Sequence, residues 1–204
     1  MPEPMVPAQP PEAPLAEIAG IYSQANAWAA PGQWITALHM GPEHCVLATG
    51  QNPAEQPSVV LTLALGTQKT ARDFFCASLP TPLELETAIA SVEDEVYAAY
   101  VRHRQWVPEG ATSLLCSTDL ALHDLATLAG IPEGHARLLS LDAMERLFNR
   151  LAAVAQGSPA AHQGLPASPA FAAALLVLRE LMHHMPFAAI TLLDGAGGSV
   201  DRAQ

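Results

Sequence analysis

Residues 34–65 read WITALHMGPEHCVLATGQNPAEQPSVVLTLAL, and they contain three strand-like runs in close succession. The runs cover 34–40, 44–49 and 58–65, and each is rich in the aliphatic and β-branched residues that strands favour. The link 41–43 is short enough to close a hairpin between the first two runs. The third run is almost wholly apolar, which is typical of a strand covered on both faces. This stretch predicts a three-stranded antiparallel meander with helices packed on it.

The clearest helix follows the meander. Thr81 is placed to be its N-cap, Pro82 suits the first helical position, and Glu84 completes a capping box. Apolar residues then recur every three or four positions, at Leu85, Ile89, Val92, Val96 and Tyr100. Acidic residues crowd the start and the other side of this helix, and we interpret them as a solvated face rather than a metal site.

The remaining elements alternate between helix and strand. Strands are predicted at 112–116 and 187–193 with a weaker candidate at 139–141, and helices at 15–29, 117–129, 140–157 and from 168 onward. A loop rich in Gly, Pro and Ala is expected at 158–167. Crossovers through helices make the later strands parallel to their neighbours. The order predicts an α/β domain on the ribonuclease-H-like plan of the actin and hexokinase superfamily, with a mixed five-stranded sheet and helices on both faces.

The composition is that of an ordinary globular domain. The 204 residues are 50% hydrophobic and 14% charged, enough to bury a substantial core. Residues 1–14 hold six prolines and are expected to be disordered, residues 15–200 to form one domain, and residues 201–204 to be a tail. Neither a signal peptide nor an apolar run long enough to span a bilayer is evident, so we expect a cytoplasmic protein.

The charge balance excludes several classes of partner. With nine Lys and Arg residues and a net charge of −11, the chain is a poor match for nucleic acid, an anionic membrane surface or loosely held polyphosphate. A local anion site built from backbone N–H groups is still compatible with this charge.

No side-chain pattern in the sequence assigns a catalytic residue, a metal or a cofactor. The three cysteines lie in apolar runs without CxxC spacing, which indicates buried free thiols in a reducing compartment. His39 and His44 flank a tight link, and His183 and His184 end a helix, but no HExxH motif accompanies them. GxSxG, GxGxxG and P-loop motifs are absent from the sequence.

Four stretches nevertheless resemble the second lobe of the exopolyphosphatase and guanosine pentaphosphate phosphohydrolase family. LGTQKTARDFF at 65–75 is similar to the family's LGxxRxTxxF run, with Lys69 in place of Arg. PTPLELE at 80–86 is similar to its PPSPEELE helix start, and 141–151 to its LTxxELERLLxxL helix. GLP at 164–166 and the strand into DG at 194–195 resemble its C-terminal part. The resemblance covers about residues 33–200 and implies the same α/β plan.

The two phosphate loops of that family are altered here. Aligned with the family's DIGGGS loop, Ala37 stands at the metal-side aspartate, Gly41 is the one glycine of three that is retained, and Pro42 replaces the serine. The GTSGT loop falls on 117–121, where both glycines are absent and Asp119 brings a negative charge. Glycine lets backbone N–H groups approach an oxyanion closely, so these changes weaken both loops. The family's first lobe, which supplies the catalytic glutamate, has no counterpart.

These departures leave three hypotheses. The first is a non-catalytic binding or regulatory module that associates with itself, as a homodimer, or with a protein partner. The second is a hydrolase of phosphate anhydrides, such as polyphosphate or guanosine pentaphosphate, with a rebuilt site. The third is a purely structural homodimer formed through the face that the missing lobe would cover. The residues that could still contact a phosphate are Gly41, Gly66, Thr67, Lys69, Ser117, Thr118 and Asp119.

Overall fold

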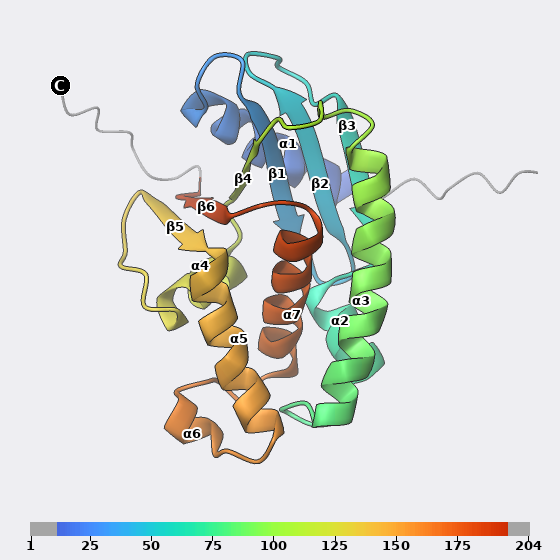
Figure 1. Cartoon of the computed structure of the whole chain (residues 1–204). Helices are drawn as coiled ribbons and strands as arrows, with labels where there is room; N and C mark the ends of the chain where they lie inside the picture. The colour runs from blue at the N-terminus through green and yellow to red at the C-terminus, as the bar shows by residue number, and fades with distance from the viewer. Residues whose placement is uncertain (1–11, 196–204) are drawn as a thin grey trace, which may run out of the picture.

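The computed structural model describes residues 12–195, which fold around one mixed sheet (Figure 1). The strands are β1 (Trp34–Met40), β2 (Cys45–Gln51), β3 (Val59–Leu63), β4 (Ser113–Ser117), β5 (Ala136–Ser140) and β6 (Ala189–Leu193). The helices are α1 (Glu12–Trp28), α2 (Thr67–Phe74), α3 (Pro82–His103), α4 (Leu120–Leu128), α5 (Leu141–Ala155), α6 (Ala160–Gln163) and α7 (Pro169–His184). Helix α1 begins three residues before the predicted boundary, and the disordered segment and tail predicted for the termini otherwise lie outside the described residues.

The strand order is β3-β2-β1-β4-β6-β5. Strands β1, β2 and β3 form the antiparallel meander, β4 is parallel to β1, and β6 is parallel to β4. The crossovers through α2–α3 and α4–α7 set these parallel pairings. The ribonuclease-H-like α/β fold expected from the sequence is confirmed.

Helices cover both faces of the sheet, as expected. The side chains of β1 alternate, so Ile35 and Ala37 pack against α1 while Leu38 and Met40 face the larger core beneath α3, α5 and α7. Figure 1 shows α1 behind the sheet and α3 and α7 in front of it. None of the described helices combines the length and the apolarity that a membrane crossing needs.

The capping box predicted for α3 is confirmed. The Thr81 hydroxyl accepts a hydrogen bond from the Glu84 backbone N–H, and the Glu84 carboxylate accepts one from the Thr81 backbone N–H at 2.7 Å. Glu84 also accepts the backbone N–H of Cys76 at 2.9 Å, and these bonds lower the pKa of Glu84 to about 2. Cys76 is exposed in the loop ahead of this helix, so the prediction that all three cysteines are buried is wrong for this one.

The prediction that residues 58–65 are covered on both faces is also wrong. Strand β3 lies at the sheet edge, and Val60 on it is 41% exposed. The reason is that α1 packs on β1, β2 and β4 and leaves the outer face of β3 open. An apolar run does not reveal whether its strand is central or at the edge.

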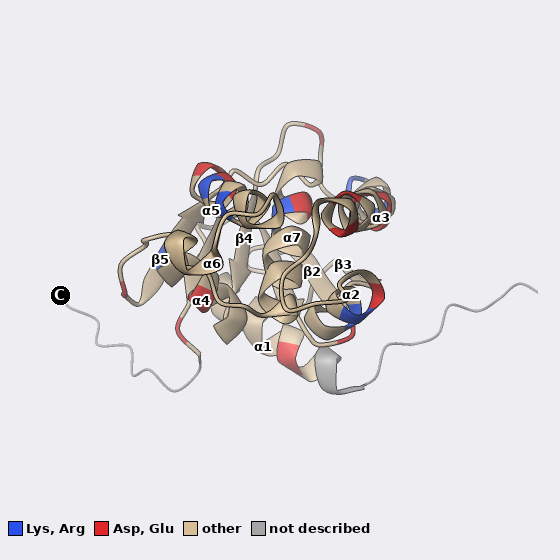
Figure 2. Ribbon diagram, turned by 90° about the horizontal axis from the view of Figure 1, so that it is seen from below, with Lys and Arg blue, Asp and Glu red and all other residues tan. Residues whose placement is uncertain are grey.

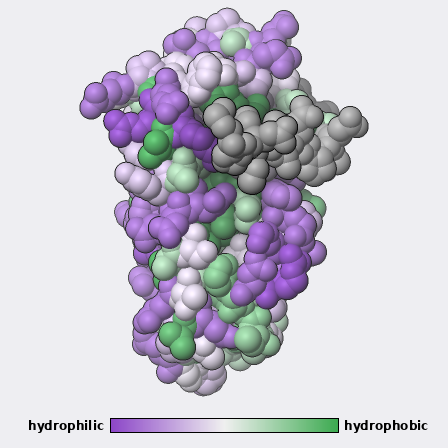
Figure 3. Space-filling view, turned by 90° about the vertical axis from the view of Figure 1, so that its right-hand side faces the viewer, coloured by the Kyte–Doolittle hydropathy of each residue, from purple (hydrophilic) through white to green (hydrophobic). Residues whose placement is uncertain are grey.

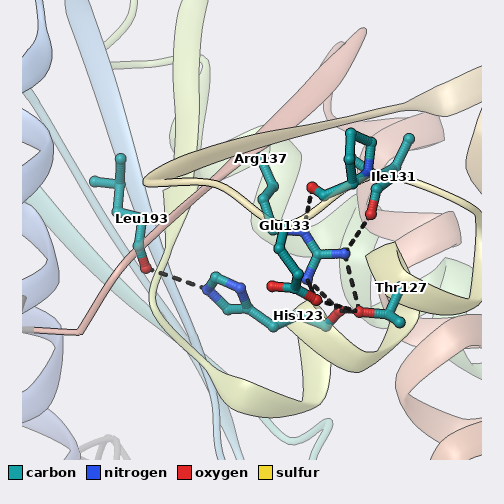
Figure 4. A network of polar contacts seen from close by, with 7 residues as sticks. His123, Thr127, Ile131, Glu133, Arg137 and Leu193 are labelled. Atoms are coloured by element: carbon teal, nitrogen blue, oxygen red, sulfur yellow. Dashed lines mark hydrogen bonds and ion pairs between the residues drawn. The ribbon is translucent and has the colours of Figure 1, made fainter.

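The sheet has six strands rather than the predicted five, because the weak candidate near 139–141 is a full strand. Strand β5 pairs antiparallel with β6 and carries a buried arginine, Arg137, which is 2% exposed. Its guanidinium donates to three backbone carbonyls, of His123, Ile131 and Pro132, and to the Thr127 hydroxyl (Figure 4). An arginine at the second position of the strand interrupts the apolar pattern by which a strand is recognised. Two short helices, α2 and α6, were likewise absent from the predicted elements.

Candidate functional site

The two altered loops meet at one edge of the sheet. Strands β1 and β4 are parallel neighbours, with Ala37 opposite Cys116, so the bends that follow Met40 and Ser117 lie side by side. In open α/β sheets, ligands bind outside the carboxyl ends of such strands. This edge is therefore the candidate site.

A carboxylate of the chain itself occupies the first bend. Asp119 Oδ2 accepts a hydrogen bond from the Met40 backbone N–H at 2.6 Å, and Asp119 Oδ1 lies 2.9 Å from His39 Nδ1. Asp119 is the N-cap residue of α4, but its side chain makes no capping hydrogen bond there. Its own backbone N–H donates to the buried Ser117 hydroxyl at 3.2 Å. The Asp119 carboxylate thus contacts residues of the neighbouring strand β1 and does not cap its own helix.

His39 links this bend to α1. Its Nε2 lies 2.8 Å from Glu17 Oε2, so both ring nitrogens face carboxylates. Imidazole donates from both nitrogens only when it is protonated. The hydrogen bond to Asp119, together with the negative charges of Asp119 and Glu17, raises the pKa of His39 despite its burial.

The N-terminus of α2 is closed by the β1–β2 link. The backbone N–H of Thr67 donates to the Gly41 carbonyl at 3.0 Å, and those of Gln68 and Lys69 donate to the Pro42 carbonyl at 2.9 and 3.0 Å. The first-turn N–H groups that could bind an anion are therefore satisfied by the protein's own carbonyls. Gly66 permits this approach, because a Cβ atom there would lie 2.3 Å from the Pro42 oxygen.

The basic residues of α2 are paired with acids. Lys69 Nζ forms an ion pair with Asp73 one turn later. Arg72 donates both terminal nitrogens to Glu43, at 3.1 and 2.9 Å, which ties α2 to the hairpin. Figure 2 shows the few Lys and Arg residues spread over several helices, including α2, α5 and α7, with acidic residues nearby. The described surface in this view offers no basic patch for a polyanion.

The predicted site residues fall into two groups that touch at the sheet edge. Gly41, Gly66 and Thr67 form the contact between hairpin and helix, and Ser117, Thr118 and Asp119 form the bend beside it. Thr118, His39 and Asp119 line a groove of about 280 Å³ against α1. Lys69 joins the first group through its backbone N–H, which donates to the Pro42 carbonyl, but it also lines a separate cavity between α2 and α3.

Other predictions about the site can be compared with the structure. Ala37, which stands at the family's metal-side aspartate, is fully buried against α1 and offers no ligand atom. The sequence predicts no contact between His39 and Asp119, because 80 residues separate them in the chain. His183 pairs with Glu145, and His184 lies 3.4 Å from Glu180. Among residues 12–195, no cluster of three His, Cys, Asp or Glu side chains could hold a metal ion.

Comparison with known proteins identifies solved structures with the same fold. The chain is similar to the Ppx/GppA enzyme of Aquifex aeolicus, with a TM-score of 0.67 and 13% identity over 89% of this chain and 60% of that one. It is also similar to an exopolyphosphatase from Cytophaga hutchinsonii (TM-score 0.64, 14% identity, 88% of this chain and 59% of that one). An exopolyphosphatase-like protein matches with a TM-score of 0.64 and 15% identity, over 90% of this chain and 62% of that one.

These likenesses establish a shared fold at low sequence identity. No protein-family model matches the chain, and no curated protein matches it. The chain spans about 60% of the length of the solved Ppx/GppA structure, which corresponds to one lobe.

Proposed function

We propose that this chain is a non-catalytic relative of the exopolyphosphatases that works as a binding or regulatory module. One observation carries the proposal: the carboxylate of Asp119 accepts the Met40 backbone N–H at the bend where the resemblance would place an oxyanion. The carbonyls of Gly41 and Pro42 fill the adjacent helix N-terminus in the same way. Both places that could receive a phosphate are thus occupied by acceptors of the chain itself, and an anion would meet like charge.

The module would act by association, in the cytoplasm. The chain spans about 60% of the length of the solved structure it matches, and a two-lobed cleft would need a second lobe beside it. A second copy of this chain or a protein with an intact first lobe could supply it. Light scattering over micromolar concentrations distinguishes the two, because a strict monomer counts against self-association.

The described surface gives little support to a large homodimer interface. Large exposed apolar side chains lie on separate elements, including Trp28 on α1, Leu83 on α3 and Leu138 on β5. Figure 3 shows apolar residues of one face in small areas separated by hydrophilic ones. A standard stable interface needs a larger continuous area. A strong homodimer through such an area is therefore disfavoured.

A second candidate is a hydrolase of phosphate anhydrides, which the contact between His39 and Asp119 favours. A protonated histidine held by a carboxylate can act as a general acid, and this one borders the 280 Å³ groove. The position of Lys69 in a different cavity weighs against it.

Phosphate release separates the two candidates. The purified chain is mixed with polyphosphate or guanosine pentaphosphate and a divalent metal ion, and inorganic phosphate is measured. We expect no release above that of a buffer control. Release that Asp119→Ala abolishes would establish the hydrolase instead, and Asp124→Ala, an exposed acid one turn along α4, is the matched control.

A further inference from the structure

A separate cavity lies at the opposite end of the sheet from the two bends. It has a volume of about 290 Å³ and lies between the end of α3, the loop 107–111 and the residues just before β6, and we refer to it as the α3-end cavity. Its lining includes Ser113, the first residue of β4, whereas the candidate site follows the last residue of that strand. Figure 1 shows the segment between α3 and β4 crossing the upper end of the sheet. The volume suits a small ligand that consists of a ring and one polar group.

A buried histidine lines this cavity with one ring nitrogen unpaired. His103 is 5% exposed, and its Nε2 lies 3.4 Å from the Thr36 hydroxyl on β1. Its Nδ1 makes no hydrogen bond or ion pair with any residue in the range 12–195. This nitrogen is nevertheless not sealed in the core, because Thr70 Oγ1 is the one side-chain polar atom of that range that is both fully buried and unsatisfied. Nδ1 therefore keeps access to solvent, and the cavity that His103 lines provides it.

Three hydroxyl groups lie behind the imidazole. Thr36 Oγ1 is 3.0 Å from Thr49 Oγ1 and 2.8 Å from Ser113 Oγ. When both of these hydroxyls donate to Thr36, the Thr36 hydroxyl donates to Nε2, and a neutral imidazole then carries its proton on Nδ1. Burial lowers the pKa of His103, so the ring is neutral near pH 7. In that arrangement the cavity faces an N–H donor.

A guanidinium group without a carboxylate partner stands at the same cavity. Arg104 lines it, lies 5.9 Å from the centre of the Tyr100 ring, and forms no ion pair or side-chain hydrogen bond within the described residues. The guanidinium groups of Arg72, Arg137 and Arg179, by contrast, all donate hydrogen bonds. A guanidinium and an imidazole N–H that face one small cavity are suited to the two oxygens of a carboxylate.

Aromatic and apolar side chains form much of the remaining lining. Phe187 is 4% exposed and meets the His103 ring edge to face, with ring centres 6.3 Å apart and planes inclined by 72°. Tyr100 and Val107 also line the cavity. A flat ring packs well against such side chains. Glu109 is the one acidic residue of the lining, so it would oppose a bound anion and its removal gives a test of the ligand's charge.

We propose that the α3-end cavity binds a small aromatic carboxylate. One carboxylate oxygen would accept a hydrogen bond from His103 Nδ1 and the other from the Arg104 guanidinium, while the ring of the ligand packs against Phe187 and Tyr100. The inference goes beyond the proposed function and is independent of it, because none of the residues of the two bends lines this cavity.

The test is an NMR titration of the isotope-labelled full chain with sodium benzoate. We expect saturable shifts of the backbone amides of Ala111, Ser113 and Phe187, with a dissociation constant of about 1 mM or below. The imidazole Nδ1 signal of His103 should move at the same concentrations, because that nitrogen gains a charge-assisted hydrogen bond. Benzamide keeps the ring without the charge and should bind about tenfold more weakly, as should benzylamine, whose ammonium group would meet Arg104.

Single changes at exposed residues separate the contacts. Arg104→Met should weaken benzoate binding at least about tenfold, because it removes one charge-assisted contact. Arg102→Met, two residues earlier and outside the cavity lining, removes equal charge and should change binding less than about twofold. Glu109→Gln should strengthen binding about twofold, because the opposing acid is removed. Circular dichroism confirms that each variant folds.

Four results would overturn the proposal. The first is the absence of saturable shifts at about 20 mM benzoate. The second is benzamide or benzylamine binding as tightly as benzoate, and the third is an equal loss in the Arg102→Met control, which would mean diffuse attraction by positive charge. The fourth is saturation of the amide shifts while the Nδ1 signal of His103 stays in place. None of these results bears on phosphate release, so failure here leaves the proposed function to its own test.

Discussion

The carboxylate of Asp119 accepts the backbone N–H of Met40 at 2.6 Å, across a sequence separation of 79 residues. A carboxylate oxygen on a backbone donor has the same chemistry as a bound phosphate oxygen, but it is covalently part of the protein and is always present. Hydrogen bonds to an ionised acceptor are short and strong. The Asp119 carboxylate therefore takes the place of a bound anion at the bend after Met40.

Removing this carboxylate should destabilise the fold. Asp119→Ala breaks the bonds to Met40 and His39 and leaves a partly buried N–H unpaired, so we expect a loss of about 2–3 kcal/mol in the free energy of unfolding. Urea denaturation measures it. Asp124→Ala is the control, because that exposed side chain forms no hydrogen bond or ion pair within the described residues, and it should change stability by less than about 0.5 kcal/mol. Equal stability of the two variants would contradict the role of Asp119.

The contact between His39 and Asp119 should make stability depend on pH. The pKa of His39 is raised in the folded state, from an ordinary value of 6.5, so its stabilising contribution is fully present below about pH 6.5. That contribution is lost as the pH rises through the raised pKa. The difference in unfolding free energy between the wild type and His39→Gln should accordingly shrink toward alkaline pH. A difference that grows with pH would contradict this assignment, and NMR titration of the imidazole gives the pKa directly.

Gly66→Ala should be strongly destabilising, although the glycine has ordinary extended backbone angles (φ −129°, ψ 160°). The new Cβ would lie 2.3 Å from the Pro42 oxygen and 2.4 Å from the Glu43 carbonyl carbon, which are backbone atoms that cannot rotate away. We expect a loss of about 2–4 kcal/mol by thermal or urea unfolding. Gly20→Ala in α1 meets no atom within 4 Å and should instead stabilise by about 0.5–1 kcal/mol. A tolerated Gly66→Ala would show that the hairpin and α2 do not pack closely.

Arg137→Met should destabilise the β5 edge of the sheet. The change leaves the carbonyls of His123, Ile131 and Pro132 without their donor, so we expect a loss of about 2–4 kcal/mol. Hydrogen exchange should show the loss first in β5 and α4. Arg146→Met, on the exposed side of α5, is the matched control and should be near neutral. A similar effect of both variants would mean that charge, rather than this network, stabilises the edge.

The sequence was sufficient to predict the elements that depend on patterns of neighbouring residues. The meander, the α3 capping box and the helix that starts after Ser140 rely on short-range patterns, and the structure contains each of them. Strand β5 was underestimated because its second residue is Arg137, whose burial depends on carbonyls of α4 and of the loop that follows it. The exposure of Val60 was missed because edge position is a property of the assembled sheet.

The candidate site was only partly accessible to sequence reasoning. The sequence shows that both bends have lost glycines and that Asp119 lies in the second bend. The pairing of Asp119 with Met40 and His39 requires β1 and β4 to be neighbours, which no local pattern encodes. Lys69 was grouped with the bend because it is near in sequence, whereas its ammonium group pairs with Asp73 on the same helix.

The amide NMR signals of Met40, Thr67, Gln68 and Lys69 give the most direct test of the central claim. Isotope-labelled protein is titrated with tripolyphosphate in the presence of magnesium. If the chain's own acceptors occupy these donors, the four amide signals should stay in place at millimolar ligand. Saturable shifts of these amides, with other amides unchanged, would show that the bends still bind an oxyanion and would contradict the account.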